Sequence, residues 1–318
     1  MVVLQGPVLG TALGACFTIS SLVLAGHYKN DVPLVSVQSG FAGFAGSVVY
    51  TALSRFSYQS SEDGNGAPVH LYTGGVMAAT LFTAFLLLAR LDPRKEKEWM
   101  EGRTLHLCMP KHFLTDLKGG RMWFFLGYML VFSGILVYPF YSIVLLTQIP
   151  GLFFPDTATY SVLTMLSVAA ILGSAAANIH VLRKIGAVNM FVAAAVLGGA
   201  ICLAPVLYPE LIVVVPLAAA YGVALGAIFS LHMVVAASFL SRKVDGRWED
   251  DMPARVAIGM VLAGLSAFGG VVGAAALIEG SERGWQIAVK VAGACMVGGS
   301  VLVGCARLWL WKGVFYAV

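Results

Sequence analysis

Long apolar runs are the feature that most constrains this chain. A helix needs about 20 apolar residues to cross the hydrocarbon core of a bilayer, and about nine runs are long enough. No water is present there to bond the backbone, so each run has to be helical. The sequence therefore predicts an all-α, polytopic membrane protein of about nine transmembrane helices. The runs lie at 5–26, 33–54, 70–91, 122–148, 157–180, 188–208, 210–240, 253–279 and 285–312.

Charge supports this prediction and orients the chain. Charged residues make up 11% of the 318 residues, against about 25% in soluble domains. With nine spans, all but three of the 20 Lys and Arg residues fall on one side; the exceptions are Arg55, Arg283 and Lys290. The positive-inside rule then places the C-terminus in the cytoplasm and the N-terminus outside. The basic loops fit the plasma membrane and also an organellar membrane.

The longest hydrophilic segments divide the chain. Residues 55–69 form a flexible outer loop, and residues 92–121 form a charge-rich cytoplasmic segment. We therefore expect a three-helix bundle at 1–91, a linker at 92–121 and a six-helix half at 122–318. Many secondary transporters consist of inverted three-helix repeats, and four such triplets make twelve spans. Three helices before the linker and six after it match such a transporter without its first triplet.

Several short stretches resemble the major facilitator superfamily, and within it the monocarboxylate porter-like branch that is abundant in fungi. The resemblance is carried by 14–17, 25–30, 39–46, 171–173, 183–189, 253–260, 269–273 and 284–285. It implies a facilitator-type transporter of a small organic solute or metabolite that works by alternating access. The chain departs from the branch at Ser174, which follows Gly173 in place of Arg, and at Leu182-Arg183, where Asp is expected. The resemblance therefore does not extend to proton-coupled monocarboxylate transport.

Polar residues inside the spans are the candidates for contact with a solute, because ionisable groups are costly in a bilayer. His232 is the main candidate, with packing near the interface as the alternative. Tyr138 and Tyr141 are three residues apart and share a helix face; the alternative for them is an interfacial aromatic belt. The remaining candidates are Gln148, Asn178 and Gln38. For Asn178 and Gln38 the alternative is interhelical hydrogen bonding.

Glycines indicate close helix contacts. Gly40, Gly43 and Gly46 recur every three residues, while Gly222 with Gly226 and Gly269 with Gly273 form Gly-xxx-Gly pairs. Small residues of this kind let helix backbones approach each other.

The sequence excludes several other functions. It contains no P-loop, no HExxH and no CxxC, so we expect no metal, no cofactor and no enzyme activity. Nucleic acid is not an expected partner; the lipid bilayer and a small solute are. Loss of one triplet opens one side of the bundle, so a partner chain or self-association would complete it. The alternative to a transporter is a truncated, non-transporting membrane protein or an incomplete gene model.

Overall fold

The structure is a computed structural model. It describes residues 32–59, 67–89, 119–147, 156–177, 184–207, 211–240, 243–244, 247–248, 252–281 and 283–310. The helices are α2 (Val32–Gln59), α3 (Ala67–Ala89), α6 (Gly120–Ile135), α7 (Val137–Thr147), α8 (Asp156–Ala176), α10 (Ala187–Leu207), α11 (Leu211–Leu240), α12 (Met252–Gly280) and α13 (Gly284–Leu310). Two short strands, β1 (Lys243–Val244) and β2 (Arg247–Trp248), form an antiparallel pair between α11 and α12.

Within the described ranges, five stretches of helix are long and apolar enough to cross a membrane, which indicates an integral membrane protein. They are Gly120–Ser142, Ala187–Ala204, Val215–Leu240, Arg255–Gly280 and Gly284–Leu310. The prediction of an all-α membrane protein is confirmed in this coarser form. The count of nine spans stays a prediction, and its first run, 5–26, lies outside the described residues.

The chain separates into two compact units, one made of residues 1–45 with 110–318 and the other of residues 46–109. Helix α2 begins in the first unit and ends in the second. Within the second unit, the hydroxyl oxygens of Tyr50 on α2 and Thr80 on α3 are hydrogen-bonded at 3.2 Å. The predicted three-part division stays a prediction, because nearly all of its linker lies outside the described residues.

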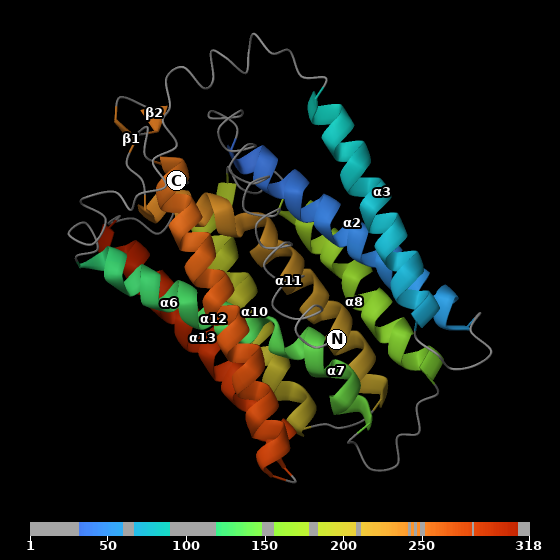
Figure 1. The fold of residues 1–318 in the computed structure, drawn as a ribbon. Helices are drawn as coiled ribbons and strands as arrows, with labels where there is room; N and C mark the ends of the chain where they lie inside the picture. The colour runs from blue at the N-terminus through green and yellow to red at the C-terminus, as the bar shows by residue number, and fades with distance from the viewer. Residues whose placement is uncertain are drawn as a thin grey trace. The chain divides into compact units, whose positions relative to one another are not determined.

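The first unit is built on a small set of helix pairs (Figure 1). Helix α6 packs along α13, and α8 packs along α11. Helix α10 packs against both α11 and α13, while α12 lies against α6 and α13. Every described helix from α6 to α13 is therefore held by at least one partner that is distant in the sequence.

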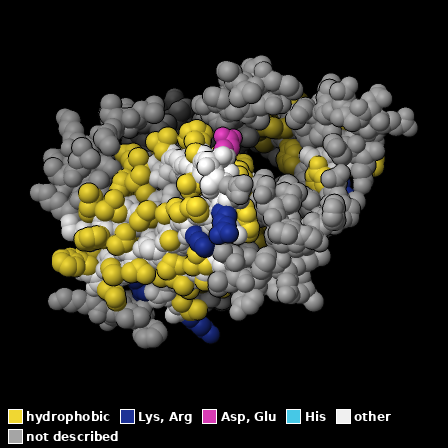
Figure 2. Space-filling view, turned by 90° about the horizontal axis from the view of Figure 1, so that it is seen from below, with side chains coloured by type: hydrophobic (Ala, Val, Ile, Leu, Met, Phe, Trp, Pro, Cys, Tyr) yellow, Lys and Arg dark blue, Asp and Glu magenta, His cyan; other side chains and the backbone are white. Residues whose placement is uncertain are grey.

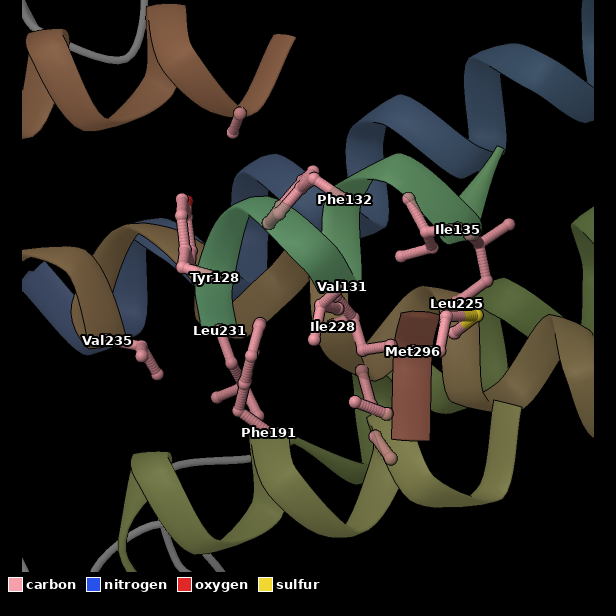
Figure 3. Close-up of a cluster of buried hydrophobic side chains, with 14 of the residues drawn as sticks. Tyr128, Val131, Phe132, Ile135, Phe191, Leu225, Ile228, Leu231, Val235 and Met296 are labelled. Carbon is pink, nitrogen blue, oxygen red and sulfur yellow. The ribbon is translucent and has the colours of Figure 1, made fainter. Parts of the chain in front are cut away.

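Helix α11 forms the centre of this packing. Its span is almost entirely buried, and the Phe239 ring stacks on Phe124 of α6 with ring centroids 4.0 Å apart. Figure 3 shows Leu231 of α11 meeting Phe191 of α10, and Leu225 next to Met296 of α13. Lipid tails are as apolar as these side chains, so close van der Waals packing holds such helices together.

Glycines make the closest of these crossings. A β-carbon on Gly226 of α11 would overlap the carbonyl oxygen of Ala170 on α8, and one on Gly222 would overlap that of Leu166. The packing predicted for this Gly-xxx-Gly pair is confirmed. The second pair differs, because a β-carbon on Gly269 or Gly273 meets no atom of the described residues within 4 Å.

A glycine with a left-handed backbone conformation directly precedes α10. Gly186 has a φ of 86° and α10 begins at the next residue. Side chains with a β-carbon rarely adopt this backbone conformation. Asn189 then donates a hydrogen bond from Nδ2 to the carbonyl oxygen of Ile185, at 2.8 Å.

The span predicted at 122–148 is interrupted. Helix α6 ends at Ile135 and α7 starts at Val137, with Leu136 between them. Pro139 explains the break: it has no backbone N–H, and its ring collides with the preceding turn of a regular helix. Pro216 lies inside α11, which is assigned as one continuous helix from Leu211 to Leu240.

The outer surface is suited to lipid. Figure 2 shows one face on which the described side chains are mostly hydrophobic, with a few basic groups and an acidic one between them. On α12, Leu265 and Phe268 are each more than half exposed. Apolar exposure on this scale is uncommon on water-soluble monomers.

Candidate functional site

His232 lies inside an aromatic cluster formed by three helices. It is on α11, one turn after Phe229, so the two side chains share a face of that helix. The Phe132 ring from α6 contacts both, with centroid separations of 6.1 Å to His232 and 6.0 Å to Phe229. Phe44 from α2 contacts Phe229 at 6.0 Å. We call these four residues, Phe44, Phe132, Phe229 and His232, the His232 cluster.

The backbone fixes the proton arrangement of His232. Its Nδ1 atom lies within hydrogen-bonding distance of the Phe229 carbonyl oxygen. Since a carbonyl oxygen only accepts, Nδ1 carries the proton and donates it. In the neutral imidazole, Nε2 is then the acceptor nitrogen. The side chain is 6% exposed, so it belongs to the interior of the bundle.

Tyr138 is also buried, and it packs against a second tyrosine. Its ring lies 4.5 Å, centroid to centroid, from that of Tyr221 on α11. The Tyr221 hydroxyl donates to the Ile135 carbonyl oxygen at 2.6 Å and lies 3.7 Å from the Met296 sulfur. Cys202 from α10 is buried in the same core cluster as these two tyrosines. Tyr138 therefore packs at the break between α6 and α7.

Tyr141 contacts a different helix. Its hydroxyl donates to the carbonyl oxygen of Val271 on α12 at 3.0 Å. The two tyrosines that the sequence places on one face thus reach different partners, α11 for Tyr138 and α12 for Tyr141. Each is used in helix packing here, and a role in solute contact stays a prediction for both.

The remaining candidates are not assembled around His232. Gln38 is exposed on α2. It lies two residues from both Ser36 and Gly40, which contact Ser230 of α11, so it points to the opposite side of α2. Gln148 and Asn178 lie outside the described residues.

Comparison with known proteins gives no further guide. No family model, no curated protein and no solved structure matches this chain. Among the described residues, no group of three or more His, Cys, Asp or Glu side chains could hold a metal ion. The function of the site has to be inferred from its own residues.

Two buried tyrosines were not among the sequence candidates. Tyr221 is fully buried and bonds to another helix. Tyr128 on α6 is 1% exposed, and its hydroxyl finds no hydrogen-bond partner within the described part of the chain. A sequence signal exists only for the first: Pro139 removes the normal helical donor to Ile135. Nothing in the sequence indicates that Tyr221 replaces it.

Proposed function

We propose that this chain is a multi-pass membrane transporter of facilitator type, which moves a small organic solute or metabolite by alternating access. The observation that carries the proposal is a repeated contact pattern among the helices from α6 to α13. The proposal includes an outside N-terminus and a cytoplasmic C-terminus, as the distribution of Lys and Arg favours. It also places the chain in the plasma membrane, which the basic loops fit.

The pattern appears when these helices are divided into two triplets. The first triplet is α6 with its continuation α7, then α8 and α10; the second is α11, α12 and α13. The first helix of each triplet packs on the third of the other, as α6 with α13 and α11 with α10. The second helix of each packs on the first of the other, as α8 with α11 and α12 with α6. The two third helices, α10 and α13, pack on each other.

Exchanging the two triplets leaves these main contacts unchanged, which supports a twofold relation between them. Paired three-helix repeats are the usual architecture of transporters whose helix bundles rock about a central solute site. A bundle that only anchored the chain in the membrane would not require a twofold relation between its helix triplets.

The His232 cluster is the candidate solute contact within this architecture. It lies where α11 and α6, the first helices of the two triplets, meet α2. The imidazole provides the acceptor nitrogen Nε2, since Nδ1 donates to the Phe229 carbonyl, and the three phenylalanine rings provide apolar edges. Together they fit an organic solute with one polar group and an apolar or aromatic body.

The test is solute counterflow in liposomes that contain the purified chain. Vesicles are preloaded with unlabelled lactate, succinate or mannitol, and uptake of the same labelled compound is compared with that of protein-free vesicles. We expect saturable accumulation of at least one compound. If none accumulates while circular dichroism shows folded helix, the chain is a non-transporting membrane protein and the proposal is wrong.

A further inference from the structure

The break between α6 and α7 leaves one carbonyl group without its normal partner. In an α-helix the carbonyl of Ile135 accepts from the N–H four residues later, and that residue is Pro139, which has none. Within a membrane span an unsatisfied carbonyl costs roughly several kcal/mol. Here the Tyr221 hydroxyl of α11 takes the place of the missing N–H and donates to the Ile135 carbonyl oxygen at 2.6 Å.

Tyr221 contacts the chain on both sides of the break. Its hydroxyl bonds to the last residue of α6, and its ring packs on Tyr138, the second residue of α7. Helix α7 is held on another side by the hydrogen bond from Tyr141 to the Val271 carbonyl on α12. Helix α7 also packs on α13, where Val137 lies against Ala288 and Ala292. Its orientation relative to α6 is therefore set by contacts with other helices and not by a continuous backbone ladder.

We infer that Tyr221 is a positioning residue that works as a latch on α7. While its hydroxyl is bonded to Ile135, α7 keeps the orientation seen here. When that bond opens, α7 is free to change its angle without unwinding either helix, because a side-chain contact has taken the place of a backbone one. The latch does not depend on which solute the protein carries, or on whether it carries one.

The test compares matched variants of two buried tyrosines. Tyr221→Phe removes the latch hydroxyl. Tyr128→Phe removes a hydroxyl that has no acceptor among the described residues, from a side chain of the same size and burial. Spin labels are placed at Phe140→Cys on α7 and Leu308→Cys on α13, which are both exposed positions. The four native cysteines other than the buried Cys202 are replaced, and the full chain is studied in lipid nanodiscs by pulsed electron–electron distance measurement.

We expect the Tyr221→Phe distances to shift or broaden beyond the width of the parent distribution, and the Tyr128→Phe distances to match the parent. Adding Pro139→Ala to Tyr221→Phe gives Ile135 a backbone donor again, so the distribution should narrow back towards the parent. A Tyr221→Phe distribution that overlays the parent would overturn the latch. Equal changes in Tyr128→Phe, or no recovery with Pro139→Ala, would overturn it too.

A folding defect does not prevent the test. If Tyr221→Phe alone does not fold, Pro139→Ala alone is measured in its place. The restored N–H should hold α7 more firmly, so a distribution narrower than the parent is expected. An unchanged or wider distribution in this variant would overturn the latch.

Discussion

Gly127 on α6 and Gly299 on α13 face each other so closely that a β-carbon on either residue would lie 2.5 Å from the carbonyl oxygen of the other. The relationship is reciprocal, so the two backbones meet here without a side chain between them. Further along α6, Gly134 is similarly pressed against the backbone of α13 at Ala292. This glycine-lined contact joins the first helix of one triplet to the last of the other.

The first prediction uses two adjacent glycines on α13. Gly299→Ala should destabilise the protein by about 1–3 kcal/mol, because the added methyl group forces two backbones apart. At the neighbouring Gly298, a β-carbon would meet nothing within 4 Å, so Gly298→Ala should be neutral or stabilise by up to about 1 kcal/mol through helix propensity. Unfolding by titration with a denaturing detergent measures both. Equal losses for the two variants would contradict the contact described.

The second prediction compares the effects on stability of alanine at two of the regularly spaced glycines of α2. A β-carbon on Gly40 would collide with Ser230 of α11, whereas one on Gly43 meets nothing within 4 Å. Gly40→Ala should lower the thermal unfolding midpoint by several degrees, since overpacking costs about 1–3 kcal/mol. Gly43→Ala should leave the midpoint within error of the parent. If Gly43→Ala is the more harmful change, α2 does not pack on α11 through this face.

The third prediction concerns a buried arginine of α12 that contacts the end of α11. Arg255 is 7% exposed and donates from Nη1 to the carbonyl oxygen of Leu240, the last residue of α11, at 3.2 Å. Hydrogen bonds to charged groups contribute about 1.5–3 kcal/mol, so Arg255→Leu should loosen this helix end. Faster amide hydrogen exchange in residues 236–240 is the expected readout. Arg283→Leu, at an exposed arginine, is the control and should leave exchange there unchanged.

The fourth prediction tests His232 in the counterflow assay. His232→Phe keeps a ring of similar size against Phe132 and Phe229 but removes both nitrogens. We expect counterflow to fall at least about tenfold, equivalent to about 1.4 kcal/mol, while the unfolding midpoint stays near the parent. His232→Ala removes the ring as well and should also reduce stability, since a cavity is left. Parent-level counterflow in His232→Phe would remove His232 from the site.

Hydropathy was sufficient to place the helices within the described chain. Each described helix lies within a few residues of an apolar run, because length and apolarity are what a bilayer requires of a span. Pro139 lies at the interrupted span, but a proline alone does not predict a break, because Pro216 lies inside the continuous α11.

The contacts between helices were less predictable. Gly222 with Gly226 and Gly269 with Gly273 have the same spacing, yet only the first pair meets another described helix. Spacing places residues on one face, but it does not say which face is turned towards a partner. Tyr221 was missed for the same reason: its acceptor is 86 positions away in sequence.

The near-complete enclosure of α11 has a consequence for how the protein is made. Once the bundle has formed, polar side chains with partners would be tolerated on this helix, because lipid scarcely touches it. Yet α11 is among the most apolar of the described spans. An apolar α11 is what insertion into a bilayer favours before any neighbour covers the helix. The same side chains that suit this helix to lipid on entry then form its packing surface inside the bundle.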